Sequence, residues 1–209
     1  MVNISAFFPR LIPNVLGCPE PLAQQALVDA AITFCDQSLA VTIDLDPVTV
    51  PVGSTAVELE TPDQTTVAQV LYVWYDKKVL NSVPYGQFTD IYRPNATPTD
   101  YTVEYLDEVA NLRVYPAPST AVDNGLVVRV ALRPTRAATQ LHDILFQRYV
   151  DGIVAGAQSI LCAIPDQPFT DTARSIAMGQ RARAAANQAR ADMMFGRSQS
   201  SMSVQLRAF

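Results

Sequence analysis

The sequence predicts an α+β protein, in which a bundle of about three helices carries an inserted antiparallel β module. Apolar residues recur at three- and four-residue spacing before residue 39 and after residue 135. Over residues 40–134 the apolar period is two, and most of the 15 prolines lie in this part. We therefore divide the chain into an arm with the first helix (1–39), the β module (40–134), the helices that complete the bundle (135–195) and a tail (196–209).

The first helix is expected to begin at Pro19 and Pro21, because proline suits the first turn of a helix. It continues to about Ser38 with small and apolar residues on one face. These residues are Ala23, Ala26, Leu27, Ala30 and Phe34. The preceding arm has no basic segment, and prolines interrupt its apolar residues, so we do not expect a signal peptide.

The β module is expected to hold short strands rich in β-branched and aromatic residues. The expected strands cover residues 41–45, 57–59, 67–74, 101–106, 112–115 and 126–132. Proline- and glycine-containing turns separate them, as at Pro51-Val52-Gly53 and Asn124-Gly125. Prolines at such positions also protect the edges of short strands from pairing with other chains.

The second helix is expected within Leu141 to Ile164 and ends before Pro165. Its Gly152-x-x-x-Gly156 spacing allows another helix to approach closely, a packing device that also serves proteins outside membranes. This segment carries Asp143, Arg148 and Asp151, so it is not expected to span a membrane.

The third helix is expected after a cap at Thr170 or Asp171, and it ends near Phe195 with Gly196 as its stop. Two thin apolar stripes follow different faces of this helix, and arginines lie between them. One stripe comprises Met178, Ala182, Ala185, Ala189 and Met193, the other comprises Ala177, Ala184, Ala191 and Phe195, and the arginines are Arg174, Arg181, Arg183 and Arg190. Two stripes favour neighbours on both sides, one of which a second copy of the chain would supply. The alternative is one wide alanine face inside a monomer, with solvated arginines.

The tail runs through small polar residues before Val204, Leu206 and Phe209. It is expected to be either a frayed end or a peptide that binds a partner's sheet or groove.

Composition favours an assembly component over a free monomer. Hydrophobic residues make up 49% of the chain and charged residues 17%, below the roughly 25% of an average soluble domain. A chain with so few charges exposes apolar surface that a partner can cover. The net charge of −5 divides into −8 over residues 1–134 (15 acidic, 7 basic) and +3 over residues 135–209 (5 acidic, 8 basic). An acidic body argues against a protein that coats DNA.

No motif indicates an enzyme or a bound cofactor. The single histidine, His142, has no nucleophile elbow beside it and is expected to be a structural or surface residue. Cys18, Cys35 and Cys162 show no zinc spacing, so we expect buried free thiols in a reducing compartment. No phosphate-binding glycine loop occurs. The carboxylates that a metal would need, Asp44, Asp46, Asp107 and Glu108, are expected to be solvated strand ends, so we assign no metal site.

Three segments resemble the head-to-tail adaptor proteins, also called connector or head completion proteins, of tailed bacteriophages. They are Gly17-Cys18-Pro19-Glu20-Pro21-Leu22-Ala23 leading into Ala30-Ala31-Ile32-Thr33-Phe34-Cys35, then Val128-Arg129-Val130-Ala131-Leu132-Arg133-Pro134, and finally Ile144-Leu145-Phe146-Gln147-Arg148-Tyr149 with Ile164-Pro165. The resemblance covers the helical parts. For the β module, it rests only on the position of that module in the chain.

The resemblance implies a ring, typically twelvefold, seated below the portal in the neck of the virion and forming a platform for the tail or nozzle proteins. Genomic DNA would pass through its lumen without specific binding, and acidic residues there would repel it. By this analogy Val204, Leu206 and Phe209 are portal-contact candidates. The subunit-contact candidates are Arg174, Arg181, Arg183, Arg190, Met178, Ala184, Ala191 and Phe195. The expected locations are the virion and, during assembly, the host cytoplasm, with no membrane contact.

The sequence is also compatible with other functions. One is another ring of the neck, such as a tail-tube terminator or a stopper. Another is a carbohydrate-binding or hydrolytic β module that uses its aromatic residues with carboxylates such as Glu58 or Glu104. A third is nucleic-acid binding by the basic residues after residue 165.

Overall fold

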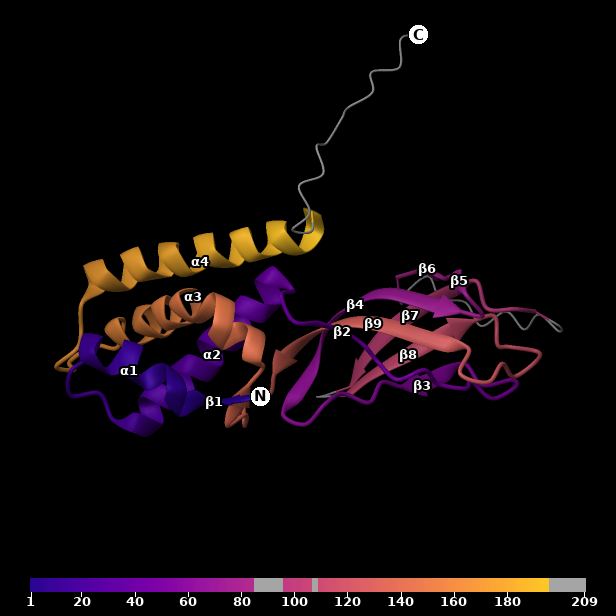
Figure 1. Cartoon of the computed structure of the whole chain (residues 1–209), viewed down its shortest axis with the longest axis horizontal. Helices are drawn as coiled ribbons and strands as arrows, with labels where there is room; N and C mark the ends of the chain where they lie inside the picture. Colours follow the sequence, from indigo (N-terminus) through magenta and orange to yellow (C-terminus); the bar gives the residue numbers. More distant parts are fainter. Residues whose placement is uncertain (85–95, 107–108, 196–209) are drawn as a thin grey trace, which may run out of the picture.

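The computed structural model describes residues 1–84, 96–106 and 109–195 and is a mixed α+β protein, as predicted. It is elongated, with the helices at one end and the sheets at the other (Figure 1). The helices are α1 (Phe8–Leu11), α2 (Glu20–Ser38), α3 (Asp143–Cys162) and α4 (Thr172–Phe195), with two 3-10 turns, η1 (Ile4–Phe7) and η2 (Ile12–Asn14). The three predicted helices are confirmed, whereas α1 was not predicted.

The β module consists of two four-stranded sheets. The strand order across the first sheet is β2 (Thr42–Asp44), β9 (Leu126–Pro134), β4 (Thr65–Tyr75) and β5 (Lys78–Val79). The strand order across the second sheet is β3 (Ala56–Glu58), β8 (Val109–Tyr115), β7 (Asp100–Leu106) and β6 (Asn81–Ser82). Buried side chains of both sheets, such as Val128 and Leu112, belong to one apolar core. The six predicted strands are confirmed.

One pair of strands departs from the antiparallel prediction. Short β6 pairs in parallel with β7, through Asn81 beside Asp100 and Ser82 beside Tyr101. A strand of two residues carries too little pattern for its direction to be predicted from sequence. A further small sheet, between β1 (Val2–Asn3) and β10 (Gln140–Leu141), holds the start of the chain against the segment before α3.

The three long helices pack closely, because α3 presents glycines to its neighbours. A Cβ atom added at Gly152 would lie 2.8 Å from the Cβ of Ala185 on α4, and one added at Gly156 would lie 3.0 Å from the Cβ of Ala30 on α2. Real Cβ atoms essentially never approach below 3.0 Å, so a side chain at Gly152 would force the helices apart, and one at Gly156 would require Ala30 to shift by a few tenths of an ångström. The glycine spacing therefore works as predicted, with one glycine facing α4 and the other mainly α2.

The amino-terminal arm belongs to the apolar core. Ile4, Phe7, Leu11 and Val15 are buried, and the ring of Phe7 meets that of Phe146 on α3 edge to face with centroids 5.2 Å apart. The sequence predicts only an arm in this segment, without a place in the core. Prolines near the starts of α1 and η2 allow tight turns there but hide the regular period of a helix.

Polar side chains join the helical end to the β module. Arg133 of β9 lies 3.1 Å from a carboxylate oxygen of Asp36 on α2. The side-chain oxygen of Gln64 accepts hydrogen bonds from the backbone N–H groups of Thr139 and Gln140, at 2.7 and 3.0 Å. These bonds fix the segment that leads from β9 into α3 and set how the two ends of the molecule meet.

The three cysteines differ in exposure, and this difference predicts their reactivity. Cys35 and Cys162 are buried, as predicted, whereas Cys18 is partly exposed, contrary to the prediction. Burial, with a smaller effect of the Asp36 carboxylate, raises the pKa of the Cys35 thiol to about 12. Because only the thiolate reacts, we expect a thiol reagent at pH 8 to label native protein first at Cys18 and to reach Cys35 only after unfolding. Mass spectrometry of a labelling time course measures this order, and rapid labelling of native Cys35 would contradict it.

Candidate interaction surfaces

Helix α4 has one covered side and one open side. Ala186 and Ala189 are buried against the other helices, and Met178, Ala182 and Ala185 are partly covered. On the open side Ala177, Ala184 and Phe195 are exposed, while Ala191 is partly covered. The first stripe is therefore the more covered of the two, although Ala191 of the second stripe is also partly covered and the buried Ala186 belongs to neither stripe. The helix begins after Asp171, whose carboxylate accepts a hydrogen bond from the Arg174 N–H at 2.9 Å.

Two of the four candidate arginines of α4 bond within the chain. The guanidinium of Arg174 donates to the backbone oxygen and the side-chain oxygen of Asn14, at 3.0 and 2.7 Å. That of Arg190 donates to the backbone oxygen of Gln37, near the end of α2, at 3.0 Å. Arg174 is half-buried and ties α4 to the arm, whereas Arg190 is exposed and keeps further donors directed to solvent.

The other two arginines lie beside shallow cavities on either side of α4. Arg181 lines a cavity of about 420 Å³ together with Met178 and the Arg10–Asp151 ion pair, whose atoms are 2.7 Å apart. Arg183 lines a narrower one of about 200 Å³ over the glycines of α3. Both guanidinium groups are exposed, and neither forms an ion pair with the described residues. Arg181 and Arg183 are therefore available to a partner's carboxylates.

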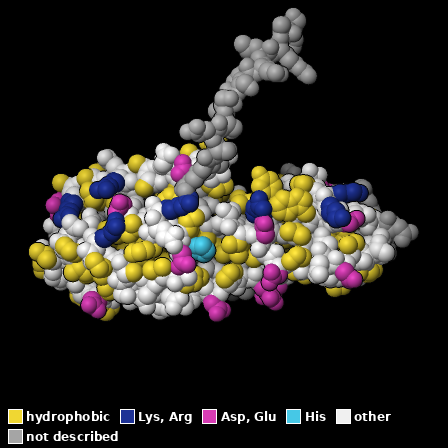
Figure 2. All heavy atoms as spheres, in the orientation of Figure 1, with side chains coloured by type: hydrophobic (Ala, Val, Ile, Leu, Met, Phe, Trp, Pro, Cys, Tyr) yellow, Lys and Arg dark blue, Asp and Glu magenta, His cyan; other side chains and the backbone are white. Residues whose placement is uncertain are grey.

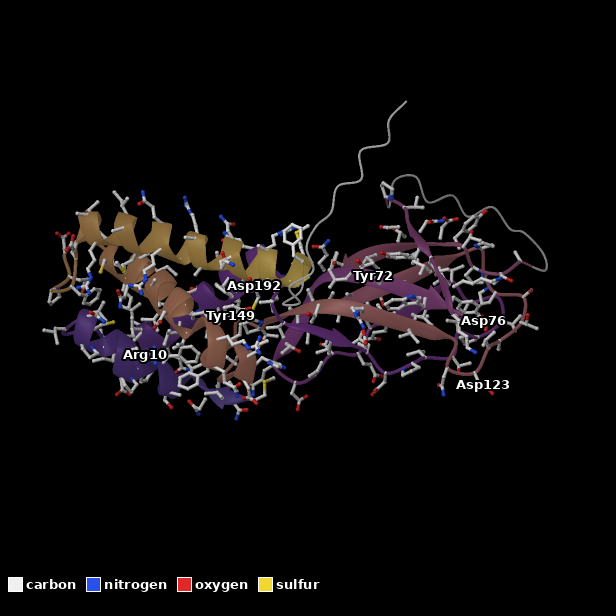
Figure 3. The ribbon with its side chains drawn as sticks, turned by 45° about the horizontal axis from the view of Figure 1, so that its top comes forward. Arg10, Tyr72, Asp76, Asp123, Tyr149 and Asp192 are labelled. Carbon is white, nitrogen blue, oxygen red and sulfur yellow. The ribbon has the colours of Figure 1, made fainter. Side chains whose placement is uncertain are left out.

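A larger groove, which we call the junction groove, lies between the end of α4 and the outer face of the first sheet. Its volume is about 630 Å³, and its apolar lining includes Ile43, Tyr72, Met193 and Met194. Figure 3 shows Tyr72 on this sheet.

A tyrosine and a carboxylate lie close together in the helical part. They are Tyr149 of α3 and Asp192 of α4 (Figure 3). Burial, and then the Asp192 carboxylate, raise the pKa of Tyr149, so its hydroxyl stays protonated at neutral pH.

An ion pair stacked on an aromatic ring borders the junction groove. Arg129 of β9 donates two hydrogen bonds to the carboxylate of Asp44 on β2, at 2.6 and 2.8 Å. Its guanidinium lies 5.6 Å from the ring centre of Trp74, and the Tyr72 ring lies beside that of Trp74 at 5.8 Å. Hydrogen bonding from Arg129 lowers the pKa of Asp44, so this carboxylate stays charged. Tyrosine, tryptophan and arginine are the residues most enriched in the energetic centres of protein interfaces.

A second hollow, which we call the acidic hollow, lies on the β module between the segment after β2 and the segment around β3. Its volume is about 310 Å³. Leu45, Pro47, Val48, Leu59, Leu126 and Val128 form its apolar part, and Asp46, Glu58 and Glu60 are its carboxylates. The three carboxylates are exposed and form no ion pair with the described residues. This hollow presents apolar surface and unpaired negative charge together.

Two residues considered for chemistry, His142 and Glu104, have structural partners, whereas Glu58 is an exposed carboxylate of the acidic hollow. The Nδ1 atom of His142 accepts a hydrogen bond from the backbone N–H of Ile144 at 3.3 Å, so this histidine caps α3. Glu104 lies 2.8 Å from Arg113. Asp107 and Glu108 lie outside the described residues. Within residues 1–84, 96–106 and 109–195, no group of three His, Cys, Asp or Glu side chains is placed to hold a metal ion.

The tail candidates Val204, Leu206 and Phe209, with the expected stop Gly196, lie outside the described residues. In the part of the chain that the structure does describe, no helix is both long and apolar enough to cross a membrane.

No protein-family model matches the chain, and no curated protein matches it either. The assignment of a function therefore depends on the surfaces described above.

Sequence reasoning had not identified the junction groove or the acidic hollow. Each combines residues from distant segments. Strand pairing makes Asp44 and Arg129 neighbours, whereas Asp46 and Glu60 come together because segments of the two different sheets line the same hollow. The sequence feature that relates to these surfaces is the alternation of charged with apolar residues along the strands. This alternation indicates which residues share one face of a strand, but it does not indicate which strands pair.

Proposed function

We propose that the chain is a structural virion protein, a head-to-tail adaptor that forms a ring between the portal and the tail of a tailed bacteriophage. The observation that carries this proposal is an uncovered apolar surface on α4 and the adjoining sheet. Ile176, Met194 and Phe195 of α4 retain 60, 64 and 63% of their accessible surface, and Tyr72 retains 54%. Met194 and Tyr72 line the same groove and Phe195 follows Met194, whereas Ile176 lies near the start of α4. Exposed large apolar side chains are typical of surfaces that bind proteins.

The organisation that we assign to the subunit is a three-helix bundle with an inserted β module. We place the subunit contacts on the outward side of α4, at Ala184, Ala191, Phe195 and Arg183, with Arg181 at its margin. Of the remaining sequence candidates, Arg174 and Arg190 bond to other parts of their own chain, and Met178 is partly covered beside a cavity. Of these three, only Arg190 is exposed.

In this proposal the ring of about twelve copies sits in the virion neck and needs no cofactor. Portal protein binds on one side and tail or nozzle proteins on the other, and the genome passes through without specific contacts. Val204, Leu206 and Phe209 remain the proposed portal contacts. Assembly takes place in the host cytoplasm.

The test is portal binding by the purified full-length chain. We expect a stable complex with the portal protein of the same phage, and an affinity lowered about tenfold or more when residues 197–209 are deleted. The deletion is expected to leave the unfolding temperature unchanged, because the buried apolar side chains of the described residues all lie between Ile4 and Ala189.

Each outcome addresses a separate part of the proposal. A full-length chain that does not bind the portal contradicts the adaptor function. Full binding by the shortened chain contradicts only the role of Val204, Leu206 and Phe209. Purification with the tail tube instead of the portal would assign the chain to a tail-tube terminator, which is another ring of the neck.

A further inference from the structure

Resting on the proposed ring, we infer that the acidic hollow of one copy binds the carboxy-terminal part of α4 of the next copy. The proposal joins two surfaces that lie on different sides of the molecule. In Figure 1, α4 runs along the upper side of the helical part, and β3 with the segment leading to it runs along the lower side of the β module. Because the two surfaces face different ways, a copy that uses one still presents the other.

Charge is complementary between the two surfaces. The acidic hollow has three exposed carboxylates, Asp46, Glu58 and Glu60, without ion-pair partners among the described residues. Near the end of α4, Arg190 lies one turn before Met194 and uses one nitrogen for the backbone oxygen of Gln37. Arg183 lies about two turns earlier and forms no ion pair with the described residues. Figure 2 shows acidic side chains along the lower edge of the molecule and Lys and Arg side chains above them. Complementary charge favours the correct partner and its orientation.

Apolar surface is complementary as well. The buried Leu59, Leu126 and Val128 form the deeper part of the acidic hollow, and Val48 is exposed at its margin. At the end of α4, Met194 and Phe195 are the large apolar side chains with the greatest exposure on that helix. A hollow of about 310 Å³ matches one or two such side chains, which would serve as central anchors surrounded by the charges.

The contact also accounts for the junction groove. Met194 lines this groove in its own copy. A neighbouring β module placed on the end of α4 would therefore lie over the groove and would cover Tyr72. Two different surfaces that bind one another give a head-to-tail contact, which closes into a ring when the rotation between copies allows it.

The test uses charge reversal in the full-length chain, with self-association measured by sedimentation velocity over a range of concentrations. We expect Glu60→Arg and Arg190→Glu each to weaken self-association about tenfold or more, because each places like charges together. The double variant pairs opposite charges at every contact again, and we expect it to recover association to within a few-fold of the unchanged chain. A contact that joins these two positions predicts this recovery together with no effect of the same charge changes placed elsewhere.

Two matched controls carry the same charge changes elsewhere. Glu20→Arg lies at the start of α2, and Arg148→Glu lies on the exposed side of α3. Both are expected to associate like the unchanged chain, and circular dichroism should show that all variants are folded.

The inference is overturned if the unchanged chain stays monomeric at every concentration, if a single reversal has no effect, or if the double variant does not recover. Portal binding does not enter these readouts, so failure of this inference and failure of the adaptor function are distinguishable.

Discussion

Replacement of Phe7 by alanine is expected to lower the free energy of unfolding by about 3–5 kcal/mol, as for other fully buried phenylalanines. Phe7 is completely buried, and its ring meets Phe146 of α3 edge to face. Its loss would leave a cavity between the arm and α3. Chemical denaturation followed by circular dichroism measures the change.

The control for this prediction lies in the same arm. Leu16 is 72% exposed, so Leu16→Ala is expected to change the free energy of unfolding by no more than about 0.5 kcal/mol. Equal losses for the two variants would contradict the placement of the arm in the core.

Replacement of Gly152 by leucine is expected to destabilise the packing of α3 on α4 by about 3 kcal/mol, at the upper end of the usual cost of overpacking. Even a single Cβ atom there would lie 2.8 Å from the Cβ of Ala185 and 3.3 Å from the Phe34 ring. Neither neighbour can move freely, because α4 and α2 hold them. Thermal and chemical unfolding would both report the loss.

Gln147 provides the matched position, since it lies exposed on the same helix. Gln147→Leu introduces the same side chain without a close neighbour and is expected to leave stability within about 0.5 kcal/mol. If Gly152→Leu were as stable as Gln147→Leu, the close approach of the helices would be wrong.

These two positions differ in what the sequence could predict. The Gly152 and Gly156 spacing is a local pattern within one helix, and it correctly indicated close helix packing. Phe7 lies in a turn of only four residues, followed by a helix of four, and periodicity needs longer segments to be visible. Its burial depends on Phe146, far along the chain.

The same distinction holds for the surfaces. The two stripes of α4 could be predicted because a helix fixes which residues share a face. The bonding of Arg174 and Arg190 could not, since Asn14 and Gln37 are 160 and 153 residues away in sequence. The acidic hollow likewise requires the pairing of β2 with β9 and of β3 with β8, which alternation alone does not specify.

The low charge of the chain and its exposed apolar groups have one explanation in this account. A subunit that meets copies of itself and further proteins needs fewer charges on its surface than a free monomer. The basic residues of α4 and the carboxylates of the β module then act between copies, although the chain as a whole has a net charge of −5.

The position and copy number of this chain in a virion test the central claim most directly. Electron cryomicroscopy of the neck is the appropriate measurement. The account predicts a ring of about twelve copies between the portal and the tail, with the end of α4 of each copy on the β module of the next. Density for the chain outside the neck, or a single copy in each particle, would contradict it.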